Sequence, residues 1–198
     1  MTFLCLFIKN ISGVEVGTRC KRVYMSSFDK QNTLVRRPED AGEFILLPAT
    51  GLDDPRASDA GRALMHFFHE RTGGTRLLKR SDFSPMDIKP YLVNIVIADL
   101  IYGEDGIVCD ATVRLMGSGL SAFYGEHTGG KVLDHPSGAG VRLVMGAREA
   151  IKAQSTVIGT SAQATQDRPL YKVATCMIPI VDDSGTVIQM LGHIYPYI

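Results

Sequence analysis

The chain has 198 residues, 45% of them hydrophobic, and its 21 basic residues equal its 21 acidic residues in number. This length and apolar content predict one folded domain and exclude global disorder, and the balanced charge gives no reason to expect binding to nucleic acid or to an anionic membrane. No apolar run approaches the roughly 18 residues of a membrane helix, and the four cysteines form no C-x-x-C motif. We therefore expect a reduced, cytoplasmic, soluble protein.

Residues 1–50 are poorly patterned and are interpreted as an N-terminal extension, so the predicted domain spans residues 51–198. Near the end of the extension, "EFILLPATG" at 43–51 is compatible with a short strand. The sequence assigns the rest of the extension no role.

The first strongly patterned element is an amphipathic helix over residues 55–72. Asp54 is the expected N-cap, Pro55 suits the first helical position, and Gly73 suits a left-handed stop. Leu64, Phe67 and Phe68 fall on one apolar stripe. The opposite face carries "H-x-x-H-E" at 66–70, which is not a zinc-protease spacing and is interpreted as solvated.

Two β-rich runs, 92–102 and 107–116, are joined by "GEDG" and predict an antiparallel hairpin. A simple register through this turn places Asp99 opposite Asp110. Like charges directly opposed are unfavourable. We therefore expect either that this pair faces solvent or that a bulge shifts the register.

Helical and then extended patterns follow. A short helix begins near Ser118 and ends at Gly125, and a longer helix spans 140–154. Three strands follow at 155–164, 170–181 and 185–197, and the last two form a hairpin around "DDSG". Strands grouped on both sides of a helical middle indicate an α+β fold with an antiparallel sheet.

The segment "RLMGSGLSAFYGEHTGG" contains a G-x-G-x-x-A match to the dinucleotide-binding fingerprint. The fingerprint requires a parallel βαβ unit, yet the preceding strand alternates polar and apolar residues and belongs to an antiparallel hairpin. Glycines at 125, 129 and 130 also end the following helix too early for a crossover connection. We interpret these glycines as devices for tight local turns instead.

Three stretches resemble the single-domain PAS proteins of alphaproteobacteria: "FHERTGGTRLLKRSDFSPMDIKPYL", "RLMGSGLSAFYGEHTGG" and "CMIPIVDDSGTVIQMLGHI". The resemblance covers about residues 62–198, although the family's tryptophan in the first helix is absent. It rests on an aromatic residue in that helix, an acid-and-proline stretch before the first strand, an Arg-Leu-x-Gly strand end, and the pairs Tyr124-Gly125 and Thr128-Gly129. It implies a PAS-like, five-stranded antiparallel sheet with short helices between strands two and three and an N-terminal amphipathic helix.

The resemblance implies a sensory or regulatory module that binds a small ligand or a signalling protein. The alternatives are a ligand-free interaction module with a filled core, or a haem-binding or enzymatic variant. No Ser-His-Asp order, carboxylate pair or metal motif stands out, which favours a protein that is not an enzyme. No cofactor is assigned, because Cys109 and Cys176 lie outside the Asn-Cys motif of flavin photoreceptors, and His127 is a lone histidine in a Gly-rich turn.

We predict a small apolar cavity between the sheet and the helices at 118–124 and 140–154, with a few polar groups to orient a ligand. The predicted ligand-binding residues are Arg114, Met116, Phe123, Tyr124, His127, Met145 and Cys176. For Arg114 the alternative is an ion pair with Asp99 or Asp110 on the face of the strand.

We also predict a homodimer whose interface includes Leu64, Phe67 and Phe68 of the first helix, because N-terminal helices of PAS-like proteins often pack against a partner. The alternative is that this apolar stripe covers the helix's own domain.

Overall fold

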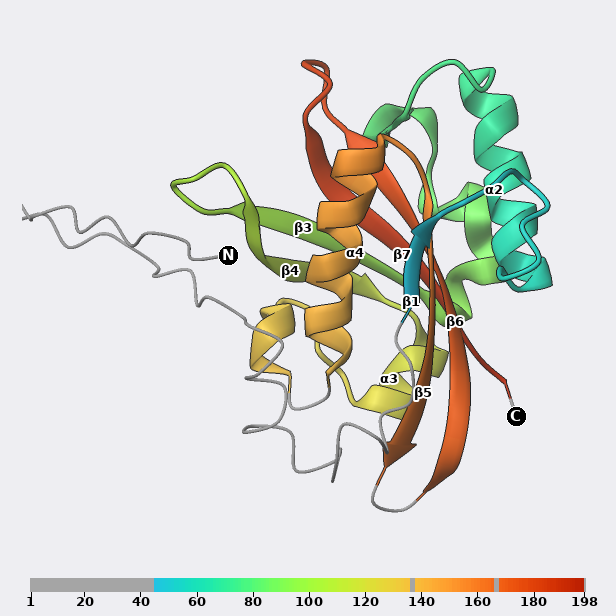
Figure 1. The fold of residues 1–198 in the computed structure, drawn as a ribbon, viewed down its shortest axis with the longest axis vertical. Helices are drawn as coiled ribbons and strands as arrows, with labels where there is room; N and C mark the ends of the chain where they lie inside the picture. Colours follow the sequence, from blue (N-terminus) through green and yellow to red (C-terminus); the bar gives the residue numbers. More distant parts are fainter. Residues whose placement is uncertain (1–44, 136–137, 166–167, 198) are drawn as a thin grey trace, which may run out of the picture.

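The computed structural model describes residues 45–135, 138–165 and 168–197. Within these residues, a twisted sheet carries helices on both of its faces (Figure 1). The strands lie in the order β1-β5-β6-β7-β3-β4, and short β2 pairs with β6. The elements in chain order are β1 (Ile45–Pro48), α2 (Asp59–Thr72), β2 (Leu78–Lys79), the 3-10 helices η2 (Arg80–Asp82) and η3 (Pro85–Asn94), β3 (Ile95–Tyr102), β4 (Val108–Met116), α3 (Ser118–Tyr124), the 3-10 helix η4 (Val132–Asp134), α4 (Ala139–Ala153), β5 (Val157–Thr165), β6 (Arg168–Val181) and β7 (Val187–Tyr197).

The predicted α+β class and element order are confirmed: two strands, short helices, one longer helix and three strands build one sheet in which these five strands pair antiparallel. Two strands were not among the expected five. β1 pairs antiparallel with β5, and β2 pairs parallel with β6 through Leu78 and Ile180. Because β1 belongs to the sheet, the domain includes residues before the expected boundary at 51. The remainder of the extension, 1–44, lies outside the described residues.

The β3–β4 hairpin avoids the Asp99–Asp110 pair by changing register. Asp99 lies opposite Thr112, and Asp110 lies opposite Ile101, with irregularities after Ile97 and after Ile101. A bulge of this kind places an extra residue on one strand and re-aims the side chains beside it. The bulge alternative is therefore confirmed, and Asp99 is free to accept a hydrogen bond from Gln189 on β7.

Helix α2 begins later than expected because Asp54 is used elsewhere. Ser58 is the N-cap, and its hydroxyl accepts a hydrogen bond from the Gly61 amide. Asp54 is almost fully buried, and its carboxylate accepts bonds from the Arg56 guanidinium and from the amides of Arg56 and Thr50. The Arg56 contact holds the Asp54 pKa far below its usual range. The helix ends as predicted at Gly73, with φ of 62°.

Both faces of the sheet are buried, and each is covered by its own cluster of hydrophobic side chains. The face beneath α2 and η3 is filled by one cluster, and the face beneath α3 and α4 is filled by a second. Leu64 and Phe68 belong to the first cluster and are 0% and 4% exposed. This corrects their assignment to a dimer interface, because both are covered by the chain's own sheet. Phe67 is half-buried, and the homodimer itself stays a prediction.

The glycines of the fingerprint-like segment permit close backbone packing. A Cβ on Gly117 would lie 1.9 Å from the Leu92 carbonyl oxygen, and one on Gly119 would lie 2.8 Å from Val93 Cγ1 and from Asn94 Oδ1. The chain therefore leaves β4 pressed against the end of η3, at a distance that side chains would prevent. Helix α3 then spans seven residues before Gly125.

Candidate functional site

A cavity of about 80 Å³ lies between the sheet and the helical segment that runs from α3 to α4. Since a single water needs roughly 10–15 Å³ on this scale, the cavity has room for several water-sized groups. Figure 1 shows α3 and α4 on one face of the sheet, with α2 on the other. The cavity is lined by Val96, Val113, Met116, Leu120, Tyr124, His127, Val132, His135, Ala139, Gly140, Arg142, Leu143, Val173, Thr175, Met177, Met190, Gly192 and Ile194.

The floor of the cavity follows from strand alternation. On β6, Thr175 and Met177 face the cavity, and on β7, Met190, Gly192 and Ile194 do so, because side chains two residues apart point to the same face. Gly192 has no side chain to crowd this part of the cavity, and a Cβ there would lie 2.9 Å from Val96 Cγ1.

Two further glycines, both on α4, allow this helix to pack closely against η4 and against the sheet. A Cβ on Gly140 would lie 1.8 Å from the Val132 carbonyl oxygen, which fixes α4 against η4. A Cβ on Gly146 would lie 2.1 Å from Met177 Sδ, which shows how closely the middle of α4 approaches the sheet. Met177 also lines the cavity, so this close contact with α4 lies at the cavity wall.

Two histidines form part of the wall. The Nε2 of His127 bonds to the Lys131 carbonyl at 2.7 Å, and the Nε2 of His135 bonds to the Tyr124 carbonyl at 2.9 Å. A carbonyl oxygen only accepts, so each Nε2 carries a proton and donates. The two rings meet edge to face, with centroids 5.0 Å apart. Burial lowers the pKa of His135, which favours its neutral form.

The structure places three of the seven predicted site residues, Met116, Tyr124 and His127, in the lining. The predicted location of the cavity is also confirmed. Phe123 and Tyr124 are neighbours on α3, and their rings meet edge to face. Tyr124 lines the cavity, whereas the predicted site residue Phe123 does not. Binding of a ligand by these residues stays a prediction.

Arg114, Met145 and Cys176 do not line the cavity, which corrects their assignment. Arg114 lies at the β3–β4 bulge, is 70% exposed, and pairs with Asp99 at 2.5 Å, as the alternative interpretation expects. Met145 lies on a different side of α4 from Leu143. Cys176 faces α2, where its Sγ lies 4.0 Å from the Gly61 carbonyl oxygen.

Sequence reasoning missed most of the sheet residues, as well as His135 and Arg142. Alternation along β6 would have grouped Thr175 with Met177, but it does not say which of the two faces holds the cavity. The start of α4 offered a clearer signal. Ala139, Arg142 and Leu143 share one helical face at spacings of three and four residues, and Arg142 is a charge beside apolar neighbours.

The face beneath α2 holds a separate group of buried polar side chains. His193 is 2% exposed, lies opposite Cys176 on the neighbouring strand, and has Nδ1 3.5 Å from the Ser58 hydroxyl. Burial lowers the pKa of His193 to about 4 and raises that of the Cys176 thiol to about 12. A neutral histidine beside a protonated thiol is an inert arrangement at neutral pH.

Among the described residues, no group of three metal-ligating side chains is present, and no cysteine lines the cavity. Cys109 and Cys176 are both buried elsewhere. The His127 Nε2 that would ligate a haem iron is bonded to Lys131.

Comparison with known proteins gave structural neighbours only. The chain matches no family model, and no curated protein matches it. It is similar to a solved structure described as an RNA-binding Light-Oxygen-Voltage receptor, with a TM-score of 0.45 and 15% identity, over 79% of this chain and 39% of that chain. It is also similar to the dark structure of the blue-light photoreceptor Aureochrome1 LOV, with a TM-score of 0.40 and 18% identity, over 62% of this chain and 89% of that chain.

The chain thus spans about two fifths of the length of the RNA-binding receptor. The class that the fold and cavity define is an α+β domain with an antiparallel sheet, helices on both faces and a cavity beneath α4. None of the helices in the described residues has the length and apolar character of a membrane span.

Proposed function

We propose that this protein is a PAS-like sensory or regulatory module, which binds a small ligand in the cavity between the sheet and α4 and passes the bound state to a signalling partner or a second copy of itself. The observation that carries the proposal is the cavity: mostly apolar, bordered by His127, His135, Arg142 and Thr175. Ligand sites are typically apolar with a few polar groups that orient the ligand.

The ligand-free interaction module is the alternative, and the cavity weighs against it. A protein interior is packed about as densely as an organic crystal, and a filled core would leave no space of about 80 Å³ beneath α4. The proposal includes no catalytic role. The single-domain alphaproteobacterial type is proposed from the three sequence stretches that resemble it.

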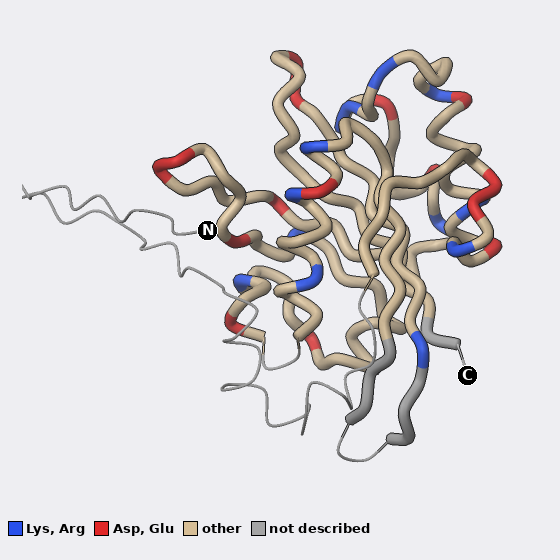
Figure 2. The backbone as a smooth tube through the Cα atoms, in the orientation of Figure 1, with Lys and Arg blue, Asp and Glu red and all other residues tan. Residues whose placement is uncertain are grey.

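The expected absence of nucleic-acid binding also stays a prediction. It is supported by the charge balance of the chain and by the mixing of basic and acidic residues along the described backbone (Figure 2). The RNA binding named for one neighbour is a property of that protein. The expected cytoplasmic location is likewise a prediction.

Adjacent residues on β6 provide a matched test of the cavity. Thr175 faces the cavity, whereas Cys176 is packed beneath α2, with its Cβ 3.3 Å from the position of a Cβ on Gly61. Thr175→Phe should fill the cavity, with a loss of less than about 1 kcal/mol in the free energy of unfolding. Cys176→Phe should overpack the core and lose about 1–3 kcal/mol.

Binding is measured in both variants and in the wild type. Native mass spectrometry and an absorption spectrum, before and after denaturation, identify any molecule carried through purification. Calorimetric titration with hexanoate and with hexanamide probes the cavity directly. Thr175→Phe should abolish binding while Cys176→Phe, if folded, retains it. A wild-type protein that carries no small molecule and binds neither probe would refute the proposed function.

A further inference from the structure

We propose that the cavity binds a small uncharged molecule with an apolar body and one hydroxyl or amide group, which hydrogen-bonds to the Thr175 hydroxyl on β6. This inference rests on the proposed function and names the ligand class for the same site. It follows from the interactions that the polar groups of the wall already make, from the surroundings of Thr175, and from the size and side chains of the apolar part of the cavity.

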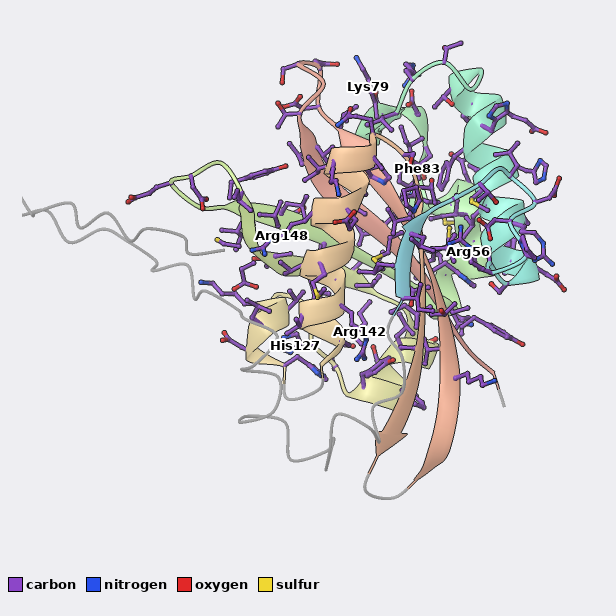
Figure 3. The ribbon with its side chains drawn as sticks, viewed as in Figure 1. Arg56, Lys79, Phe83, His127, Arg142 and Arg148 are labelled. Carbon is purple, nitrogen blue, oxygen red and sulfur yellow. The ribbon has the colours of Figure 1, made fainter. Side chains whose placement is uncertain are left out.

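The charged and titratable groups of the wall already have partners within the protein. The Nε2 atoms of His127 and His135 each donate to a backbone carbonyl, at 2.7 and 2.9 Å. Arg142 also has an interaction partner, and Figure 3 shows it at the same end of α4 as His127. A charged ligand would lose its hydration and would have to compete for these groups. An uncharged ligand leaves their interactions in place.

Thr175 differs from these groups in its surroundings. Its partners on the two adjacent strands are Gly159 on β5 and Ile194 on β7. Val173 and Met177, two positions away on β6, point to the same face as Thr175. None of these four residues has a side chain that hydrogen-bonds strongly. No hydrogen bond to the Thr175 hydroxyl is found among the described residues, so the hydroxyl is available to a ligand.

A hydroxyl in an apolar wall is unfavourable unless it is hydrogen-bonded, and a valine would occupy nearly the same volume without that cost. Thr175 is half-buried, and the other strand residues that line the cavity in the described part of the chain are apolar. A hydroxyl both donates and accepts, so either an alcohol or an amide can pair with it. The contact would direct the polar end of the ligand toward β6.

The apolar part of the cavity suits a short hydrocarbon body. Met116, Met177 and Met190 are among the lining residues, and methionine side chains are flexible enough to adapt to the shape of a ligand. A cavity of about 80 Å³ corresponds to roughly five to eight water-sized positions. A ligand of about this number of non-hydrogen atoms therefore fits.

Hexanamide and hexanoate test the charge of the ligand, because they have the same number of non-hydrogen atoms and only hexanoate is ionised at neutral pH. Isothermal titration of the full chain should show hexanamide binding about tenfold or more tightly than hexanoate. The reason is that the carboxylate loses hydration, and the engaged groups of the wall do not replace it.

Substitutions of Thr175 test the proposed hydrogen bond. Thr175→Val keeps the shape and removes the hydroxyl, so it should reduce the affinity for hexanamide about three- to tenfold, as expected for one neutral hydrogen bond. Thr175→Ser keeps the hydroxyl and should bind hexanamide more tightly than Thr175→Val does, although serine is smaller and less apolar. An effect of packing alone would give the opposite order.

Thr160→Val is the matched control. Thr160 is a half-buried threonine of the adjacent strand β5, but it lies opposite Ala174 and is not part of the lining. This variant should bind hexanamide as the wild type does. A circular-dichroism spectrum of each variant checks that it is folded.

The outcomes separate this inference from the proposed function. If hexanoate binds the wild type as tightly as hexanamide or more tightly, the cavity binds ligands but does not select an uncharged one, and the inference is overturned without any variant. Equal affinities of the wild type and folded Thr175→Val for hexanamide also overturn it, as does a charged molecule carried through purification. If neither probe binds the wild type and no molecule is carried through purification, the proposed function fails and the inference fails with it.

Discussion

Acidification should destabilise this protein through His193. The imidazole is 2% exposed beneath α2, with the Ser58 hydroxyl at 3.5 Å from its Nδ1. Burial lowers its pKa from 6.5 to about 4. In the unfolded chain this histidine takes up a proton near pH 6.5, while in the folded chain it stays neutral until about pH 4, so the unfolded state binds more protons in this range.

The sign and size of the effect follow directly. The stabilising contribution is fully present above about pH 6.5 and is lost as the pH falls toward about 4, with a slope of up to about 1.4 kcal/mol per pH unit. The free energy of unfolding should therefore fall by about 3 kcal/mol across this window. Asp54 adds little there, because its pKa lies far below the usual value and its contribution is lost only at lower pH.

Urea unfolding at several pH values between about 7 and about 5 measures the slope. His193→Leu removes the titrating group and should flatten the curve, whereas His69→Gln changes an exposed histidine of α2 and should leave it steep. His135, whose pKa is also lowered by burial, accounts for a smaller residual slope. Parallel losses of stability in the wild type and in His193→Leu would refute the reasoning.

The remaining predictions concern packing. Phe68→Glu should unfold the protein, at a cost of about 3 kcal/mol or more, because it buries a charge in the core beneath α2. Phe67→Glu, at the half-buried neighbour, should fold, and its sedimentation then tests the predicted homodimer; a folded Phe68→Glu would contradict the placement of α2. Gly140→Ala should cost about 1–3 kcal/mol in thermal or urea unfolding, because its Cβ meets the Val132 backbone. Gly51→Ala, which meets nothing within 4 Å, is the control, and equal stabilities would argue against the tight contact between α4 and η4.

The sequence predicted the parts of the fold that depend on neighbouring residues. Gly73 and Gly125 end their helices as expected, since a left-handed or otherwise unusual backbone selects glycine locally. The helix at 140–154 and the hairpin around residues 182–185 were also found within one or two residues. The element order predicted the antiparallel sheet because short turns join strands that must run in opposite directions.

The choice of hydrogen-bond partner among nearby polar groups, and the bulges between β3 and β4, were decided only in the folded structure. Asp54 has the residue type and position of an N-cap, but Thr50 and Arg56 bind its carboxylate, so Ser58 caps the helix instead. The register of β3 and β4 depends on bulges, and these left Arg114 at the surface beside Asp99. Neither partner could be chosen from the local sequence, which offers several polar groups within reach.

The cavity is the clearest example of a feature that the sequence pattern leaves open and the tertiary structure decides. Alternation separates Cys176 from Met177 on β6, but both side chains are apolar and both are buried, so the pattern does not say which face lies beneath α2 and which beneath α4. That choice is made by helices far away in the sequence, which cover both sides of the sheet. A strand that is buried on both faces carries no polar face to orient it, and for this reason only the tertiary structure could place Thr175 in the cavity and Cys176 outside it.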